Sequence, residues 1–515
     1  MGQRNYTDSD CPVSTAALRQ QLHEELDGIA DWCEHNNERF FAFEKQLKVL
    51  LWTLARLCIS LFLLSRQQRR DRTKQDYPGY RRCSDLLSRT LRTMFGEVIY
   101  ARAYWFRRAG GGGFHPLDVE LGLTRDGFSL GVISLACRLA AYLSFAKTEL
   151  VLTAFWGWSP STETVEQWVL GLGRETSAYM ASPPLPEADG DVLVIEIDGK
   201  AVPTATAAEL EKRRGPRRHP PGCGCGCQRH RGRAKRRWLK RNCHNRKKRR
   251  TKGDKSKNGK SATLVAMYTL VLGADGKLHG PKNKLVWGSF ASRKQMMKWA
   301  RAAATQRGFG PGTTKLIQIV MDGEKCFAKR LRKLFPKAIL TLDIFHVEER
   351  LWKAGRAFHA EGSDELAAWV QELRRVLYQR GGKALVRRLQ EMRAQIADRG
   401  PGTKGKRAAL DGLLKYLQPR RKMMRYPRLR KRDLVISTGV IEGAVRYVIG
   451  ERMDCSGMRW IKEKAEAILQ LRCIEVNGHW DDFFDWCQER WRQSLANHEA
   501  VQIRTDRPLE FSKAA

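Results

Sequence analysis

Acidic residues are scarce in this chain, whose 515 residues include 55 Asp and Glu against 94 Lys and Arg, for a formal net charge of +39. A chain this basic repels itself unless it meets a polyanion, so nucleic acid is the first partner to consider and a membrane surface the second. Long uninterrupted apolar runs are also missing. The most apolar stretch, residues 49–65, holds Arg56 at its middle, which at the centre of a bilayer would cost about 2.5–3.5 kcal/mol. We therefore expect no membrane association, and instead a helix that packs within its domain or pairs two copies.

The sequence also shows neither a regular cysteine framework nor a signal-peptide pattern. The 13 cysteines are odd in number and follow no regular spacing, which excludes a secreted disulfide scaffold and suits a reducing cytosol. The residues after Met1 are polar, so we expect no signal peptide. These observations predict a cytoplasmic protein associated with the nucleoid. The length allows about three domains of roughly 150 residues each.

Three short apolar runs each end in an aspartate. Residues 191–200 read DVLVIEIDGK, residues 315–323 read KLIQIVMDG, and residues 338–351 read AILTLDIFHVEERL. Short β-branched runs are typical of buried strands. Strands that end in carboxylates gather acids at one edge of a sheet, and with a late glutamate this geometry can hold two divalent metals for phosphoryl transfer. Taken singly, an Asp-Gly pair is also a common turn signal. The candidate acids are Asp198, Asp322 and Asp343.

The order of the strands predicts a mixed sheet. The strand that ends at Asp198 precedes two strands at residues 263–272 and 284–290, which a hairpin turn joins. Helices and strands then alternate as far as a helix that begins near His346. Three strands in a meander followed by this alternation is the order of an α/β ribonuclease-H-like core, with helices on the faces of the sheet. We assign this core to residues 182–362.

The region before the core, residues 1–181, is predicted to be mostly α-helical. The expected elements are helices at 14–35 and 38–66, a charged loop at 66–75, a helix from Ser84 to about Gly96, and a strand at 98–108 before a glycine run. Residues 147–172 resemble a helix-turn-helix. Glu163 and Glu166 at the start of its second helix are unfavourable beside phosphates, and ordinary helix packing is the alternative. Residues 182–190 are rich in Pro and acid and predict a linker.

A basic arm interrupts the predicted core. Residues 211–260 hold 22 Lys and Arg against two acids, which suits a segment that releases counterions when it binds phosphate. A second basic cluster begins at Arg420. The candidate nucleic-acid contacts are Arg236, Arg237, Lys240, Arg241, Lys247, Lys248, Arg249, Arg250, Arg420, Arg421 and Lys422. The arm also contains possible zinc ligands, but C-x-C-x-C is not a usual zinc spacing, and free thiols are the alternative. These are His219, Cys223, Cys225, Cys227, His230, Cys243 and His244.

Residues 363–432 are predicted to form a basic helical insertion, after which residues 433–515 return to the core. A helix in this last part carries Glu442. The glutamate is either a third metal ligand that the chain brings back to the sheet edge, or the partner of Arg446 in an i, i+4 ion pair worth about 0.3–0.5 kcal/mol.

Four pieces of the chain, IEIDGKAVP, VMDGEKCF, LDIFHVEERLWKAGRAF and STGVIEGAVRYVIGERMDCSGMRW, resemble bacterial insertion-sequence transposases of the Kra type, distant kin of the Mutator-like elements. The resemblance covers roughly residues 85–480, and its most specific block runs from Glu442 to Trp460. It implies a DDE transposase on a ribonuclease-H-like fold, with a helical insertion before the last acid.

Carried over by motif, the catalytic and metal-binding acids are Asp198, Asp322 and Glu442. Asp343 and His346 match a recurring Asp-x-Phe-His element, and the resemblance implies that they support the ligands or position DNA. Asp343 remains a rival of Asp322 for the second ligand.

An enzyme of this family would use two Mg²⁺ or Mn²⁺ ions to cut DNA at the ends of an element and to join the freed 3′-OH to target DNA. Recognition of the ends and oligomerisation are expected before residue 182, with a homodimer or larger assembly on DNA. The alternatives are an inactive nucleic-acid-binding protein derived from a transposase, an RNA-associated nuclease component, since the arm would hold RNA as well as DNA, and a ribonuclease-H-like resolvase.

Overall fold

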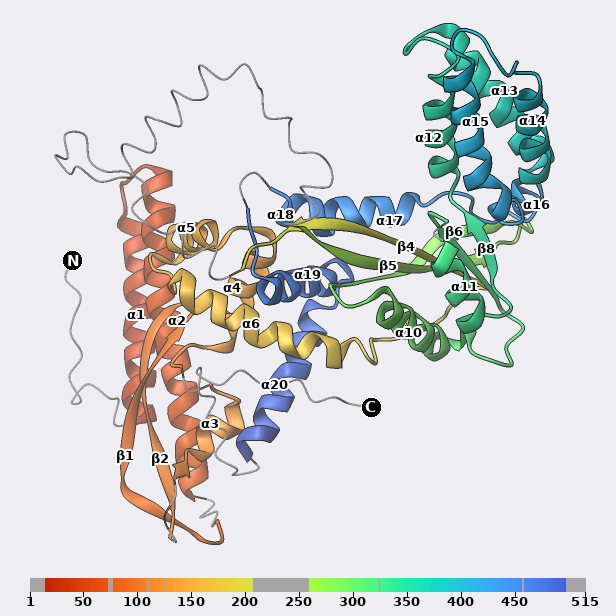
Figure 1. Ribbon diagram of the computed structural model, residues 1–515. Coiled ribbons are helices and arrows are strands. Elements are labelled where there is room, and N and C mark those ends of the chain that lie inside the picture. The colour runs from red at the N-terminus through yellow and green to blue at the C-terminus, as the bar shows by residue number, and fades with distance from the viewer. Residues whose placement is uncertain are drawn as a thin grey trace, which may run out of the picture. The chain divides into compact units, whose positions relative to one another are not determined.

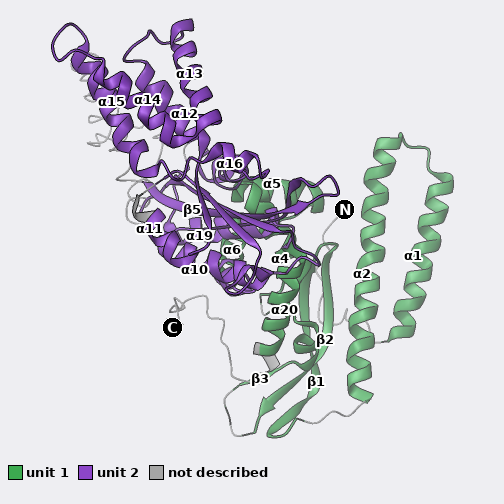
Figure 2. Ribbon diagram, turned by 90° about the vertical axis from the view of Figure 1, so that its right-hand side faces the viewer, with its two compact units in different colours: residues 1–172, 480–515 green, residues 173–479 purple. Residues whose placement is uncertain are grey.

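The computed structural model describes residues 14–72, 77–108, 110, 112–124, 126–206, 259–323, 325–455 and 458–496. The chain divides into two compact units, one of residues 1–172 with 480–515 and the other of residues 173–479 (Figure 2). The predicted arm contacts from Arg236 to Arg250 and the cysteine and histidine cluster from His219 to His244 lie outside the described residues.

The first unit is mostly helical and contains a three-stranded antiparallel sheet in the order β1-β2-β3. Strands β1 and β2 lie side by side (Figure 1). A small core forms between α2 and this sheet, around Leu63, Leu91 and Val98. The elements that begin in this unit are α1 (Thr15–His35), α2 (Phe40–Arg72), β1 (Tyr80–Thr93), β2 (Gly96–Arg107), β3 (Gly113–Phe114), α3 (Pro116–Leu121), α4 (Leu130–Tyr142), α5 (Phe145–Trp156), α6 (Thr162–Tyr179) and α20 (Trp480–Ala496).

The helix expected from Ser84 to about Gly96 is wrong, because these residues belong to strand β1 and to its turn into β2. The two strands pair antiparallel from Tyr80 opposite Arg107 to Thr93 opposite Gly96, with one irregularity between Arg82 and Leu86. The ladder with β2, together with the core that its apolar side chains enter, overrides the local helical pattern.

The second helix is longer than expected and less covered. Residues 66–72, predicted as loop, continue α2, because Arg66 and Arg70 both bond to Glu120. Internal packing of the apolar face is observed only in part, around Ile59 and Leu63. Phe40 is 72% exposed and Val49 is 59% exposed. By length and composition, α2 is the one helix among the described residues that could cross a membrane, and little of its apolar window is buried.

The second unit contains the mixed five-stranded sheet that the sequence predicted, in the order β6-β5-β4-β7-β8. Strands β4, β5 and β6 form the antiparallel meander, and β4, β7 and β8 run parallel. The strands are β4 (Val192–Pro203), β5 (Gly259–Leu272), β6 (Leu278–Ser289), β7 (Leu316–Met321) and β8 (Ile339–Leu342). Buried apolar residues fill β4 and β5, as expected for a sheet with helices on both faces.

Helices lie on both sides of this sheet, with α17 on one side of β4 and β5 and α10 on the other (Figure 1). The helices that follow β8 pack together, α12 against α13 and α15, and α14 against both of these. The helical elements are α10 (Arg293–Ala304), η2 (Thr305–Phe309), α11 (Lys325–Leu334), α12 (Ile344–Gly355), α13 (Asp364–Arg380), α14 (Gly382–Ala394), α15 (Thr403–Leu417), η3 (Gln418–Arg420), α16 (Tyr426–Arg430), α17 (Gly439–Ala444), η4 (Val445–Gly450), α18 (Glu451–Met453) and α19 (Lys462–Val476).

The segment predicted as a linker ends in a buried ion pair. Asp189 accepts hydrogen bonds from two nitrogens of Arg307, Nε at 2.7 Å and Nη2 at 2.8 Å, and the side chains are 9% and 3% exposed. Thr269 and Asn283 also donate to Asp189. The end of this segment is therefore anchored to strands β5 and β6 and to the η2 turn.

Candidate active site

Three aspartates stand at corresponding positions of the three parallel strands. Ile197 of β4 pairs with Met321 of β7, and Met321 pairs with Leu342 of β8. The next residue in each case is an aspartate, Asp198, Asp322 or Asp343. Neighbouring residues at one level of parallel strands project to the same face, so the register brings all three acids to one edge of the sheet.

The register of β4 and β7 places Asp198 and Asp322 on neighbouring strands. Burial raises the pKa of Asp198, and the Asp322 carboxylate raises it further. The backbone N–H of Gly199 and the cations His346 and Arg293 act in the opposite direction. A pair of neighbouring carboxylates is a natural place for a cation.

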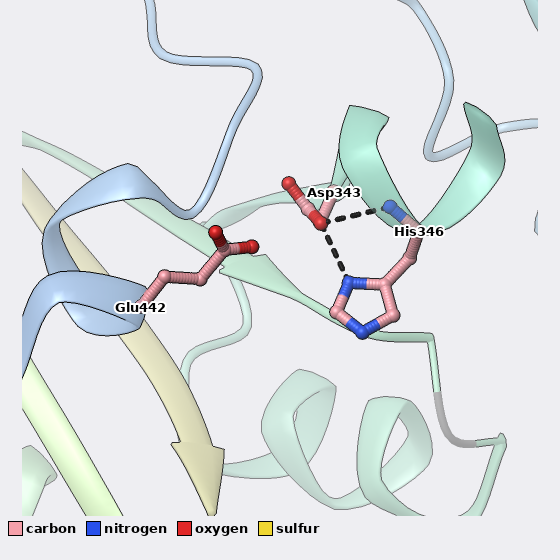
Figure 3. A group of neighbouring side chains, drawn as sticks. All are labelled: Asp343, His346 and Glu442. Carbon is pink, nitrogen blue, oxygen red and sulfur yellow. Dashed lines mark hydrogen bonds and ion pairs between the residues drawn. The ribbon is translucent and has the colours of Figure 1, made fainter. Parts of the chain in front are cut away.

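The third aspartate forms a group with His346 and Glu442, whose possible ligand atoms all lie within 4.8 Å of one another (Figure 3). Asp343 is fully buried and caps the start of α12. Its Oδ2 accepts from the backbone N–H of His346 at 3.0 Å and from the imidazole Nδ1 at 2.6 Å. Its Oδ1 accepts from the backbone N–H of Thr438 at 2.9 Å. Both oxygens of Asp343 are therefore engaged by donors that fix α12 and the approach to α17.

His346 interacts with Asp343 and also with the charges of Asp198 and Asp322. The hydrogen bond with Asp343 raises its pKa, and the charges of Asp343, Asp322 and Asp198 raise it further, against the effect of burial. The charge of His346 also lowers the pKa of Asp198, so the imidazole contacts Asp343 and acts electrostatically on Asp198. The structure thus groups Asp343, His346 and Glu442 directly, and the strand register brings Asp198 and Asp322 to the same edge of the sheet. The catalytic roles of all five residues stay predictions.

Glu442 lies exposed in the first turn of α17. Thr438 donates its hydroxyl to the Glu442 carboxylate at 3.2 Å, and the Glu442 N–H donates to the Thr438 carbonyl at 3.0 Å. Both Glu442 and Arg446 are described residues, and no ion pair joins them. The glutamate is therefore available to a ligand at the site.

Glu196 was not among the site residues predicted from the sequence. This glutamate lies two residues before Asp198 on β4 and is fully buried. It accepts from the Tyr268 hydroxyl at 2.6 Å and from the backbone N–H of Ile441, in the first turn of α17, at 2.8 Å. Burial raises its pKa to about 7, and Asp343 and Glu442 act in the same direction, against these two hydrogen bonds. An acid two residues from Asp198 in an otherwise apolar strand was the available signal.

We expect Glu196→Ala to lower any activity of this site about 10- to 100-fold, because the variant releases the first turn of α17, which carries Glu442. Glu196→Gln retains an acceptor for Ile441 and should keep most of the activity. Glu466→Ala is the matched control, since Glu466 also accepts from a hydroxyl, that of Ser289, and from a backbone N–H, that of Phe290. Equal losses in both alanine variants, measured as kcat at unchanged circular dichroism, would argue against a positioning role.

The turn after β7 is held by the end of the helical insertion. The Tyr416 hydroxyl donates to the Asp322 carbonyl at 2.6 Å, and Arg420 donates to the Gly323 carbonyl. Gly323 has φ of +82°, and a Cβ there would approach Leu342 Cδ1 to 2.5 Å and Arg420 Nε to 2.8 Å. This turn therefore requires glycine at position 323.

The predicted nucleic-acid contacts of the second basic cluster differ in their surroundings. Arg420 is only 9% exposed, and its guanidinium also donates to the Tyr416 carbonyl. Arg421 and Lys422 are exposed, and Arg421 donates to the Gln418 carbonyl at 2.7 Å. Arg421 and Lys422 therefore face solvent, whereas Arg420 supports the turn that carries Asp322.

The donor set fits a divalent cation. Carboxylate oxygens suit Mg²⁺ and Mn²⁺, and an imidazole nitrogen is a further ligand that Mn²⁺ and later transition metals accept. Both oxygens of Asp343 already accept hydrogen bonds. Asp198 accepts one from the backbone N–H of Gly199, and Glu442 accepts one from the Thr438 hydroxyl.

No protein-family model matches the chain, and no curated protein matches it. Among solved structures, the chain is similar to one titled "Drosophila P element transposase strand transfer complex". The likeness has 14% sequence identity and a TM-score of 0.28, and it covers 70% of this chain and 94% of that chain. A likeness this distant carries no information about chemistry, and the geometry of the site stands on its own.

Proposed function

We propose that this chain is a metal-dependent DDE transposase of the Kra type, which cuts and joins DNA on a ribonuclease-H-like core. One observation carries the proposal. Asp198, Asp322 and Asp343 follow one level of three neighbouring parallel strands, and Glu442 reaches His346 and Asp343 from beyond the helical insertion. The net charge of +39 supplies the attraction to a polyanionic substrate.

In this proposal, Asp198, Asp322 and Glu442 hold the divalent cations. Asp343 serves instead as an orienting group, because its two oxygens accept hydrogen bonds from Thr438 and His346. The bound cations would supply Lewis-acid chemistry, activating a water or a 3′-OH and stabilising the leaving oxygen of a phosphodiester.

The chain's own residues would position the substrate around this centre. Asp343 fixes the imidazole of His346 through Nδ1, so that Nε2 is the nitrogen left to contact a phosphate or to carry a proton. Glu196 and Asp343 each accept from a backbone N–H at the start of α17, and they thereby hold Glu442 at the sheet edge. Tyr416 holds the backbone of Asp322.

The partners in this proposal are element-end DNA, target DNA and further copies of the chain. The apolar face of α2 is the surface we assign to self-association, because Phe40, Val49 and Leu51 are exposed within a single copy. A membrane is a poorer partner for this face. Arg56 at its middle donates to the Phe95 carbonyl at 2.9 Å and is part of the folded unit. We place the protein in the cytoplasm.

The proposal predicts strand cleavage that requires Mg²⁺ or Mn²⁺. Incubation of the purified protein with a plasmid that carries its gene and the flanking DNA should give cuts at defined positions beside the gene, and EDTA should abolish them. Cleavage that persists in EDTA would contradict a metal centre. Binding that is equal with and without metal, and never followed by a nick, would instead indicate an inactive binding protein.

A competition experiment separates DNA from RNA as the substrate. At fixed salt, unlabelled DNA duplex should displace the bound plasmid fragment more effectively than RNA of the same length. Both competitors carry the same phosphate charge, so a difference between them reports a preference for one polymer. Stronger competition by RNA would favour the RNA-associated nuclease.

A further inference from the structure

Arg350 lies on α12, one turn beyond His346, and its guanidinium faces an aromatic ring. The guanidinium carbon is 3.6 Å from the centroid of the Tyr416 ring, while the residue as a whole is exposed. Arg420 lies 4.1 Å from the same centroid. Arg350 also forms a side-chain hydrogen bond with Tyr416. A guanidinium has five N–H donors in one plane, so the remaining N–H groups can meet a planar or tetrahedral anion.

The ring under Arg350 is itself fixed to the candidate active site. The Tyr416 hydroxyl donates to the Asp322 carbonyl at 2.6 Å, and Arg420 joins the carbonyls of Tyr416 and Gly323. Arg350 therefore has two connections to the site, one through α12 to His346 and Asp343, and one through Tyr416 to the turn of Asp322. A positive group fixed in this way needs little ordering when it binds.

Arg350 also differs from arginines nearby that carboxylates neutralise. Arg374 pairs with Glu348 at 2.7 Å, and Arg388 pairs with Glu372 at 2.8 Å. Within the described part of the chain, Arg350 forms no ion pair with a carboxylate. Its full charge therefore remains beside a group of acids that would otherwise repel a phosphate.

We propose that Arg350, stacked on Tyr416, binds a phosphate of the nucleic-acid backbone beside the acidic site. This inference rests on the proposed function for the identity of the ligand, a phosphodiester. It deepens that function by assigning a substrate-binding residue that the basic clusters of the sequence do not contain. The planar guanidinium can donate two parallel hydrogen bonds to the phosphate oxygens, which lysine cannot.

The test measures DNA binding as a function of salt concentration, in EDTA, so that no cleavage occurs. Each phosphate contact contributes about 0.9 to the slope of log affinity against log salt concentration for duplex DNA. Arg350→Ala should therefore lower the slope of the full-length protein by about 0.9. Arg350→Lys should keep the slope near the wild-type value and lose affinity, because the charge remains and the planar donor is lost.

Arg387→Ala is the matched control, because Arg387 on α14 is exposed, carries the same charge, and is neither stacked on a ring nor paired with a carboxylate among the described residues. The slope of log affinity against log salt concentration for Arg387→Ala should equal that of the wild type. A slope for Arg350→Ala equal to the wild-type slope, or an equal drop in Arg387→Ala, would overturn the inference and leave the cleavage experiments unaffected. A wild-type protein that bound no nucleic acid would overturn the proposed function itself.

Discussion

Replacement of Asp198, Asp322 or Glu442 by alanine should lower metal-dependent DNA cleavage at least about a thousandfold, which corresponds to about 4 kcal/mol of transition-state stabilisation. In the proposed site, Asp198 and Asp322 at the sheet edge and Glu442 on α17 would hold the cation, and loss of any one would leave it with an incomplete set of ligands. DNA binding should survive, because it depends on Lys and Arg side chains outside this site. Single-turnover cleavage and an independent binding titration, measured on the same preparations, separate the two effects.

Asp275→Ala is the control for this series. Asp275 is an exposed carboxylate in the turn between β5 and β6, where it pairs with His279 at 2.9 Å. Its loss removes the same charge without touching the site, and cleavage should be unchanged. Asp343→Ala should lower cleavage by an intermediate factor of about 10- to 100-fold, because Asp343 orients His346 and is not itself a proposed metal ligand. Equal activity of Asp198→Ala and Asp275→Ala would remove the proposed ligand set.

Asp189→Leu should destabilise the second unit by about 3–5 kcal/mol, because it leaves Arg307 charged, buried and without its carboxylate. Urea unfolding followed by circular dichroism should show a lowered midpoint. Asp198 lies nine positions after Asp189 in the sequence. Asp189→Leu should lower stability, whereas Asp198→Ala should lower cleavage alone.

The same ion pair predicts a pH dependence. Burial on its own would raise the pKa of Asp189, but hydrogen bonds from Arg307, Thr269 and Asn283 outweigh it, so the pKa in the folded state is lowered. The ion pair therefore stabilises the folded state fully at any pH above the unfolded-state pKa of Asp, about 3.9. This stabilisation is lost as the pH falls through the lower pKa that Asp189 has in the folded state. Asp189→Asn combined with Arg307→Met should regain stability relative to Asp189→Leu. A midpoint that does not change in Asp189→Leu would contradict the buried pair.

The strands of the second unit could be predicted because each contains a short apolar run that is buried. The less buried extensions were not predicted, namely residues 278–283 of β6 and 199–203 of β4. Residues 192–197 are all buried, so the run carries its own signal. Strand β1 could not be found in this way, since much of YRRCSDLLSRTLRT is exposed and its conformation depends on pairing with β2. Long-range pairing of this kind leaves little trace in local sequence.

The acids of the site were predictable for a similar reason. Asp198, Asp322 and Asp343 each end an apolar run, and a parallel sheet aligns such ends. The residues that hold these acids in place were not predictable, because their contacts join distant parts of the chain. Tyr416 reaches Asp322 across 94 residues, and Glu196 reaches Ile441 across 245.

The central claim is that Asp198, Asp322 and Glu442 meet around a bound divalent cation. Iron-mediated cleavage of the protein tests this claim without any DNA or enzymatic activity. Fe²⁺ substituted for Mg²⁺, with ascorbate and peroxide, generates hydroxyl radicals that cut the polypeptide close to the metal. We expect cuts near residues 198, 322 and 442 in the same sample, which excess Mg²⁺ or Mn²⁺ suppresses. Cuts confined to one of these segments, or found only elsewhere in the chain, would contradict the account.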